Sequence, residues 1–392
     1  MKRMRRLPGL ALFLALVGLL LIQALPAVAA HPGRPDARDP FWGQVSSGGF
    51  GDVKNHDIWA GMAVFGGYLY VGTENGTSGA EVLRSVDCMA WSQANTDGFG
   101  DPNNKGVSSM TVFDDYLYAS TNHAGTGGQI WRSNDGTTWS QVGGGGLGDS
   151  NNIDILAMAV FSDCIYAGTR NDVSGAEVWR SANGTDWSQV NTDGFGDRDN
   201  KGASSIAVFG NDVYAGTWNE DSGAEVWRSP NGTDWTQVNT DGFGDRNNGA
   251  IWTLAMITFD GYFYVGTQHY ASGAEVWRSN NCTTWNQVNT NGFGDRDNGI
   301  VGSMAVFGNQ LYAGTYNEDT GAEVWRSADG TTWGQVNQDG FGNANNQYVW
   351  AMAVFGDHLY AAAGNGTSGA EVWRTNCLLY TPLVVRNFKG QP

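Results

Sequence analysis

Aromatic residues stand beside asparagine or histidine at three loop positions of this chain, in a pattern that suits sugar binding. The three pairs are Trp218 with Asn219, His269 with Tyr270, and Tyr316 with Asn317. Aromatic rings stack on the C–H faces of a carbohydrate, and polar side chains pair with its hydroxyl groups. We therefore expect these six side chains to line one arc of a ligand-binding surface.

Other tryptophans could belong to the same surface. Trp59, Trp252 and Trp350 each come just ahead of a short apolar segment. They either contribute to ligand binding, or they plug the centre of the molecule and pack between its repeats.

A second group of side chains could hold a metal ion. The motif Gly-Phe-Gly-Asp-x-x-Asn recurs, often with an Asp ahead of its first Gly. Calcium takes six to eight oxygen ligands, and the candidate ligands are Asp193, Asp197, Asn200, Asp241, Asp245 and Asn248. The spacing matches no EF-hand loop. The favoured alternative is a turn in which Asp and Asn accept hydrogen bonds from the backbone.

These candidate residues lie between copies of a repeat. The phrase Gly-Ala-Glu-Val-Trp-Arg-Ser stands complete four times, at Gly175–Ser181, Gly223–Ser229, Gly273–Ser279 and Gly321–Ser327. A second phrase, Met-Ala-Val-Phe or a variant, recurs seven times at spacings of 48 or 50 residues. Such a period, built of short strands, is typical of a β-propeller. The sequence thus predicts an all-β fold, a seven-bladed β-propeller of four-stranded antiparallel blades.

Each repeat contains four candidate strands. Met-Ala-Val-Phe is apolar enough for an innermost strand buried on both faces, and an alternating strand such as Leu69–Thr73 follows it. The Glu-Val-Trp-Arg run is the third strand, and Trp-x-Gln-Val is the fourth. The tryptophans of these last two phrases recur in nearly every repeat, so we expect them to be scaffold residues.

The order of the phrases predicts how the ring closes. Phe41–Val45 is a fourth-strand phrase that precedes any first strand, and the last repeat ends at Thr375 without a fourth strand. We therefore expect the N-terminal strand to pair with Glu371–Thr375 and complete the last blade, which removes an open sheet edge.

The ends of the chain read as separate segments. Residues 1–30 combine four basic residues, an apolar run and a small-residue cleavage site, which predicts a signal peptide. Residues 31–40 form a linker, residues 41–377 the propeller, and residues 378–392 a C-terminal tail too short to span a membrane. An uncleaved membrane anchor at the N-terminus is the alternative. We expect a secreted or cell-surface protein with no transmembrane span in its mature form.

Charge limits the choice of partner. Loss of residues 1–30 leaves 18 basic against 39 acidic residues, a net charge of −21. This charge argues against nucleic acid and anionic membranes. It is compatible with divalent cations, neutral glycans or basic proteins.

The four cysteines, Cys88, Cys164, Cys282 and Cys377, allow three pairings if two disulfides form. Cys88 and Cys282 fall in the first and fifth repeats, on opposite sides of the ring, so they should not pair. Cys88 and Cys377 fall in repeats that meet across the closure, and theirs is the most attractive pairing.

The turn before the fourth strand resembles a known sequence motif. Ser133-x-Asp135-Gly136-x-Thr138-Trp139 is similar to the Asp-box (BNR repeat) of sialidases and other secreted propellers, although one residue shorter. The resemblance touches six of the seven repeats. It implies a propeller fold in which the box is a structural turn, and it carries little information about function.

A sialidase-like hydrolase would hold its substrate carboxylate with three converging arginines. The third-strand arginines recur once per repeat, from Arg84 to Arg374, and such a symmetric ring does not form a single catalytic centre. The Phe/Tyr-Arg-Ile-Pro segment of sialidases is missing, as are a nucleophile elbow and a His-Glu-x-x-His motif. The best arginines for such an enzyme are Arg170, Arg198, Arg246 and Arg296.

We therefore expect a non-enzymatic binding or adhesion scaffold that recognises a glycan or an extracellular protein. A glycan-cleaving enzyme with its site in the same funnel, or a structural cell-surface component, is the alternative. The oligomeric state stays open.

Overall fold

The computed structural model describes residues 42–375, which form an all-β structure. The signal peptide, linker and tail expected at residues 1–30, 31–40 and 378–392 lie outside the described residues, as does Cys377. Among the residues described, no helix is long and apolar enough to cross a bilayer.

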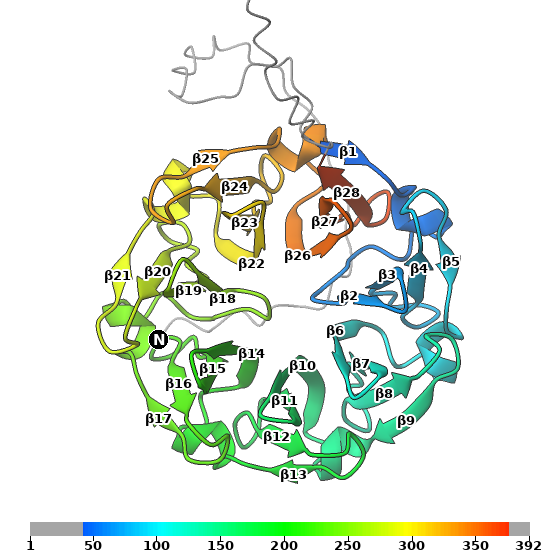
Figure 1. Cartoon of the computed structure of the whole chain (residues 1–392), viewed down its shortest axis with the longest axis horizontal. Helices are drawn as coiled ribbons and strands as arrows, with labels where there is room; N and C mark the ends of the chain where they lie inside the picture. The colour runs from blue at the N-terminus through cyan, green and yellow to red at the C-terminus, as the bar shows by residue number, and fades with distance from the viewer. Residues whose placement is uncertain (1–41, 376–392) are drawn as a thin grey trace, which may run out of the picture. The chain divides into compact units, whose positions relative to one another are not determined.

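The strands form four-stranded antiparallel units arranged around a centre (Figure 1). The innermost strands are β2 (Met62–Phe65), β6 (Val107–Phe113), β10 (Asn152–Phe161), β14 (Gly202–Phe209), β18 (Met256–Phe259), β22 (Ile300–Phe307) and β26 (Tyr348–Phe355). The second strands are β3 (Tyr68–Gly72), β7 (Tyr116–Thr121), β11 (Cys164–Asn171), β15 (Asp212–Trp218), β19 (Tyr262–Gly266), β23 (Gln310–Tyr316) and β27 (His358–Gly364).

The third and fourth strands lie progressively farther out. The third strands are β4 (Val82–Ser85), β8 (Gln129–Ser133), β12 (Val178–Ser181), β16 (Val226–Ser229), β20 (Val276–Ser279), β24 (Val324–Ser327) and β28 (Glu371–Thr375). The outermost strands are β5 (Ser92–Gln93), β9 (Ser140–Gly143), β13 (Ser188–Gln189), β17 (Thr236–Gln237), β21 (Asn286–Gln287), β25 (Gly334–Gln335) and β1 (Trp42–Gln44).

A short 3-10 turn follows every outermost strand and leads into the next unit. These turns are η1 (Gly48–Gly51), η2 (Asp97–Gly100), η3 (Gly145–Gly148), η4 (Asp193–Gly196), η5 (Asp241–Gly244), η6 (Asn291–Gly294) and η7 (Asp339–Gly342). The glycine at the second position of each turn and the Phe or Leu that follows it both have a positive φ near 60°. The recurring Gly-Phe-Gly motif therefore forms a tight turn.

Neighbouring units pack face to face through apolar residues. The cluster that holds Tyr70 and Val82 of one unit also holds Val107 and Leu117 of the next. A glycine in the second strand makes this close approach possible: a Cβ on Gly72 would lie only 2.4 Å from the Cβ of Val107. The innermost strands are less buried than the sequence predicts, because their valines stay partly exposed: Val64, Val112, Val160, Val208, Val306 and Val354 are 37–43% exposed.

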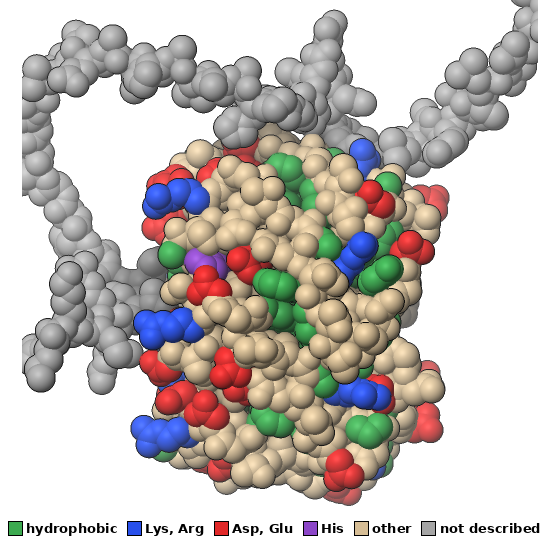
Figure 2. All heavy atoms as spheres, turned by 90° about the vertical axis from the view of Figure 1, so that its left-hand side faces the viewer, with side chains coloured by type: hydrophobic (Ala, Val, Ile, Leu, Met, Phe, Trp, Pro, Cys, Tyr) green, Lys and Arg blue, Asp and Glu red, His purple; other side chains and the backbone are tan. Residues whose placement is uncertain are grey.

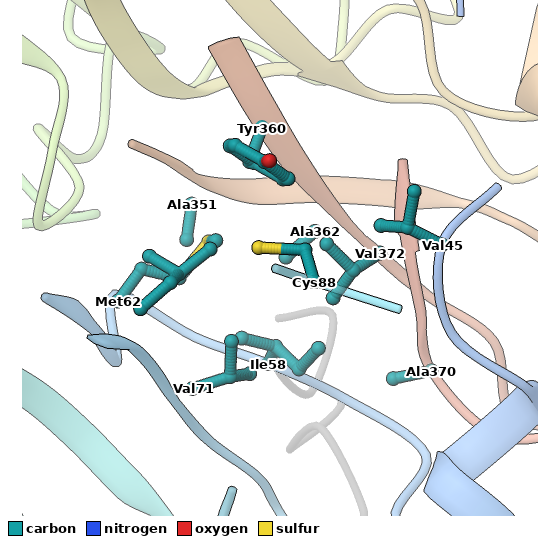
Figure 3. Close-up of a cluster of buried hydrophobic side chains, with 11 residues drawn as sticks. Val45, Ile58, Met62, Val71, Cys88, Ala351, Tyr360, Ala362, Ala370 and Val372 are labelled. Carbon is teal, nitrogen blue, oxygen red and sulfur yellow. The ribbon is translucent and has the colours of Figure 1, made fainter. Parts of the chain in front are cut away.

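Buried cysteines replace glycine in two of the turns before the outermost strands. Cys88 lies in the cluster between the first and last units, near Tyr360 (Figure 3). Cys88, Cys164 and Cys282 form no disulfide with one another, and burial raises the pKa of the Cys88 and Cys282 thiols. A bond from Cys88 to Cys377 falls outside the described residues and stays a prediction.

The N-terminal strand pairs with the last third strand, as the sequence predicts. β1 runs antiparallel to β28, with Trp42 opposite Thr375 and Gln44 opposite Trp373. Ser46 extends the contact, since its Oγ accepts a hydrogen bond from the Val372 backbone N–H at 2.8 Å across 326 residues of chain. Trp42 is buried and packs edge-on against Phe341 at 5.6 Å. In Figure 1, β1 lies beside β28.

Removing β1 should therefore weaken the whole structure. Deletion of residues 31–46 exposes the edge of β28 and the core beneath it, and we expect the cooperative unfolding transition to be lost. Thermal and urea unfolding followed by circular dichroism would measure it. Deletion of residues 31–40 leaves β1 intact and serves as the control. An unchanged transition in the longer deletion would show that β1 contributes no stability.

Candidate functional site

A belt of paired residues runs around one end of the strands. The belt residue of each unit lies at or just after the end of the second strand, and in five of the seven units it follows Gly-Thr. In most units it pairs with the segment that leads into or begins the first strand of its own unit, and with the same segment of the next unit. Trp218, for example, pairs with Gly202 on one side and Ala250 on the other. The pairs form a series around the belt, which begins with Asp57 and ends with Gly364.

The belt is the place where the units differ. Its second-strand members are Glu74, Asn122, Arg170, Trp218, Gln268, Tyr316 and Gly364. Similar backbone pairing recurs around the belt, yet each unit contributes a different side chain. An asymmetric site is therefore built on a repeating scaffold.

Six aromatic side chains form a continuous aromatic arc on one side of this belt. Successive ring centroids are 5.5, 5.5, 5.3, 4.6 and 6.2 Å apart in the order Trp218, Trp252, Trp350, Tyr348, Tyr316 and Tyr270. Tyr316 and Tyr348 are stacked within 14° of parallel. Tyr270 is 56% exposed, and the other five rings are partly exposed. The arc thus offers aromatic faces to solvent.

Polar groups orient several rings of the arc. The Arg170 guanidinium lies 4.8 Å above the Trp218 ring and is held by two hydrogen bonds to Asp172, at 3.1 and 3.0 Å. The Trp252 indole donates to Gln268 Oε1 at 3.0 Å. The hydroxyl of Tyr316 donates to Glu318. These contacts restrict ring motion and so lower the entropic cost of binding.

Three carboxyl groups lie in the same belt. Asp57 is buried and accepts hydrogen bonds from the Ile58 backbone and from the Trp59 and Trp350 indoles. Glu74 also accepts from Trp59, and Asp154 accepts from Ser108 at 2.6 Å.

Burial is the main cause that raises the pKa of all three carboxyls. It raises the pKa of Asp57 to about 7 and that of Asp154 to about 6. The pKa of Glu74 rises to about 8, first through burial and then through the charges of Asp57 and Asp154. Near neutral pH, part of this group is protonated and can donate hydrogen bonds as well as accept them. Perturbed carboxyls beside exposed aromatic rings are typical of a functional site.

The sequence-predicted ligand residues separate into two sets. Trp218, Tyr270 and Tyr316 belong to the aromatic arc, as their contacts show. Asn219, His269 and Asn317 do not lie at its surface, because each is at most 2% exposed. The side chain of Asn219 accepts the backbone N–H groups of Asp221 and Ser222, both at 3.0 Å. Every unit has Asn or His at this position, so these three residues are part of the repeated scaffold.

The proposed calcium ligands also form hydrogen bonds within their own loops. Asp193 accepts from Gln189 at 2.7 Å, and Asp245 accepts from the Asn247 backbone and from His269. Asp197 and Asp241 are engaged in the same way, by the Asp199 backbone and by Gln237. Asn200 and Asn248 are fully buried and donate to the carbonyls of Gly194 and Gly242 at 2.9 Å. Within residues 42–375, no three His, Cys, Asp or Glu residues cluster as metal ligands would.

The candidate arginines do not form one group. Arg170 belongs to the belt, whereas Arg198, Arg246 and Arg296 are exposed in the loops that follow η4, η5 and η6. Arg296 has a side chain that is 76% exposed, and it forms an ion pair with its neighbour Asp297 at 3.5 Å.

Two residues of the site, Asp57 and Asp154, were not predicted from the sequence. Both stand at the start of a first strand, where two of the other units have Gly106 or Gly202. A comparison of this position across the repeats would have revealed two acidic residues among small and apolar ones.

The fold is that of a β-propeller, as comparison with solved structures shows. The chain is similar to the WD40 propeller domain of Doa1 (TM-score 0.55, 12% identity, covering 85% of this chain and 96% of that one). It is also similar to U3-55K (TM-score 0.52, 11% identity, covering 81% and 95%). It matches half of a prolyl endopeptidase chain (TM-score 0.51, 13% identity, covering 82% of this chain). No family model matches this sequence, and neither does any curated protein.

The hydrogen bonds within the links generate a prediction about calcium. Since the Asp and Asn side chains are already hydrogen-bonded to groups of the protein itself, EDTA should leave the melting temperature unchanged. Differential scanning calorimetry with and without EDTA would measure it. A lower melting temperature that Ca²⁺ restores would instead identify the links as metal sites.

The raised carboxyl pKa values generate a prediction about pH. A carboxyl whose folded pKa is raised stabilises the protein fully below its unfolded pKa near 4, and this contribution is lost as pH rises through the folded value. The free energy of unfolding should therefore fall between pH 5 and pH 9. Asp57→Asn removes the titrating group and should reduce that fall by about 2 kcal/mol.

Urea unfolding at a series of pH values would measure this effect. Asp135→Asn is the matched control, because the equivalent turns carry Asn183 and Asn231 and the pKa of Asp135 is lowered by backbone hydrogen bonds. The control should keep the wild-type pH dependence between pH 5 and pH 9. The same dependence in Asp57→Asn would show that Asp57 does not titrate in this range.

Proposed function

We propose that this chain is a secreted, seven-bladed propeller that binds carbohydrate through its aromatic arc and catalyses no reaction. The observation that carries the proposal is the arc itself: six touching aromatic rings, partly open to solvent, at the belt where the repeats differ. The scaffold does not require these rings, because the equivalent positions of other repeats carry different residues. A row of neighbouring aromatic rings suits a sugar chain that stacks on several of them.

The blade count and the closure are supported by the strand pairing. The described strands group into fours, and β1 supplies the fourth strand beside β26, β27 and β28. In this arrangement the two ends of the domain are joined by hydrogen bonds, and its sheets leave only short outer edges.

The turns support membership of the Asp-box class. Asp135 Oδ1 accepts the backbone N–H groups of Thr137 and Thr138 at 2.7 and 2.6 Å, and Ser133 donates to the same oxygen. The Trp139 indole then donates to the Ala94 carbonyl of the preceding unit at 2.9 Å. This geometry explains the recurring Ser-x-Asp-Gly-x-Thr-Trp pattern as a structural turn.

Export is supported by the sequence of residues 1–30, with its basic start and apolar run. A net charge of −17 for the full chain, or −21 after loss of these residues, disfavours nucleic acid as the partner. An uncharged glycan on a cell surface or in the surrounding matrix fits both properties.

A glycan-cleaving enzyme is the second candidate, and one observation favours it. Asp57, Glu74 and Asp154 have raised pKa values, and glycosidases pair a protonated carboxylic acid with a second carboxylate. A purely structural surface component would bind no glycan. Turnover of a panel of fluorogenic glycosides, together with a glycan array, distinguishes the three.

The proposed function predicts selective loss of binding from the arc. Trp218→Ala and Tyr316→Ala each remove one exposed face, and should weaken glycan binding by about tenfold with the melting temperature within a few degrees of wild type. Binding to the array ligands would be quantified by isothermal titration calorimetry.

Trp227→Ala is the contrasting variant, because Trp227 stacks on Phe195 at 4.8 Å and donates to Glu225. It should lower the free energy of unfolding by about 3–5 kcal/mol. If both arc variants bind every array ligand as wild type does, the site is elsewhere.

A further inference from the structure

Three clefts lie at equivalent places on the outer edge of the described structure, far from the centre that the belt surrounds. One wall of each cleft is the outermost strand of one unit. The opposite wall is formed by the next unit, through its Ser-x-Asp-type turn and the start of its outermost strand. Their volumes are about 500, 400 and 310 Å³, and they lie beside β1, β5 and β13. In Figure 1 these strands form the rim of the molecule.

The walls of each cleft are aromatic. In the cleft beside β5, Phe99 stacks on Trp131 at 4.9 Å and meets Trp139 edge-on at 5.4 Å. In the cleft beside β13, the equivalent Phe195 has the same two contacts at 4.8 and 5.6 Å. All of these rings are partly exposed.

The remaining lining is uncharged and combines hydroxyl and amide groups with a few apolar side chains, among them Met89 beside β1 and Val190 beside β13. Thr96 and Thr137 are exposed on the two sides of the cleft beside β5, and the half-buried Asn95 also lines it. Among the described strands, β5 pairs only with β4, so its outer backbone edge faces the cleft region.

Within residues 42–375, no charged side chain lines any of the three clefts. Elsewhere on this molecule charges are frequent: Figure 2 shows acidic and basic side chains spread over one side of it. A charged ligand would therefore find no partner in the clefts. Aromatic faces beside hydroxyl and amide groups suit an uncharged ligand that has both C–H faces and hydroxyls.

We infer that each of these clefts binds one neutral monosaccharide unit, such as the end of a glycan chain. Volumes of about 310–500 Å³ lie in the lower part of the range of small-molecule sites, roughly 300–1,000 Å³. Several weak sites on one rigid rim bind a surface that displays many copies of a sugar far more tightly than any one site does. These sites are independent of the aromatic arc, since they share no residue with it.

The chain itself provides a conservative variant for the test. Leu147 takes the place of this Phe in η3, with the same positive φ and the same backbone hydrogen bond to the residue three positions earlier. Replacing Phe50, Phe99 and Phe195 by Leu therefore removes an aromatic wall from each cleft while keeping a side chain that this fold already accommodates.

The experiment titrates a panel of neutral methyl glycosides (glucose, galactose, mannose, fucose, N-acetylglucosamine and N-acetylgalactosamine) into the full chain and measures affinity and stoichiometry by calorimetry. We expect at least one glycoside to bind at more than one site per chain. In the triple Phe→Leu variant its affinity should fall by about tenfold, whereas Trp218→Ala should leave these sites unchanged.

A second variant covers the case in which the triple variant folds poorly. Thr96 and Thr192 are exposed in extended backbone, and their carbonyls, not their side chains, hold the turn. Thr96→Lys with Thr192→Lys should block two clefts and lower the stoichiometry.

Three results would overturn the inference: no glycoside binds, both sets of cleft variants bind as wild type does, or all binding is lost in Trp218→Ala. Loss of all binding in Trp218→Ala would support the aromatic arc as the single binding site. If instead the clefts bind as expected and the arc variants bind as wild type does, the proposed function is wrong and the cleft inference stands.

Discussion

A buried asparagine at the end of each link is the interaction on which the rest of the structure depends. In the link after η5, Asn248 donates to the Gly242 carbonyl at 2.9 Å and to Glu275 at 2.7 Å, and it accepts from Thr267 at 2.7 Å. One side chain thus joins the turn, the second strand and the third strand. The glutamate in turn accepts from the indole of Trp277. Leaving a buried donor or acceptor without a partner costs roughly 1–3 kcal/mol, and loss of the asparagine would leave several buried groups unpaired.

This set of hydrogen bonds explains why the same residues recur at these positions in nearly every repeat. The Glu and Trp of the repeated phrase, the Thr of the second strand and the Asn of the link form one hydrogen-bonded set, and a change in any of them leaves a buried polar atom without a partner. Where Gln129 replaces the glutamate, it still pairs with Asn104 and Trp131. The scaffold therefore tolerates only substitutions that keep the hydrogen bonds.

The belt residues are free of this constraint because their backbone, and not their side chains, holds the units together. One unit can present Glu74, another Trp218 and another Gly364 at equivalent places without disturbing the pairing. This freedom allows an aromatic arc and a group of carboxyls with raised pKa to occupy different parts of one belt. The outer clefts show the opposite case, since their Phe and Trp walls are scaffold residues and therefore recur from unit to unit.

The sequence by itself determined the strand content, the four-stranded units and the partner of the N-terminal strand, because the repeated phrases set strand length, turn position and register locally. It also identified Trp218, Tyr270 and Tyr316 as residues that differ from one repeat to the next. It did not reveal that Asn219, His269 and Asn317 are buried, because exposure depends on the Asp and Asn side chains that pack over them from a link about twenty residues earlier.

Only the tertiary structure decided which of the differing residues meet. Trp218 and Tyr270 are separated by 52 positions in sequence, yet both belong to one arc through Trp252, Trp350, Tyr348 and Tyr316. The raised pKa of Glu74 arises from burial beside Asp57 and Asp154, which come from two different units. Both effects depend on distances across the ring of units, and such distances follow from sheet-to-sheet packing that no local sequence pattern records.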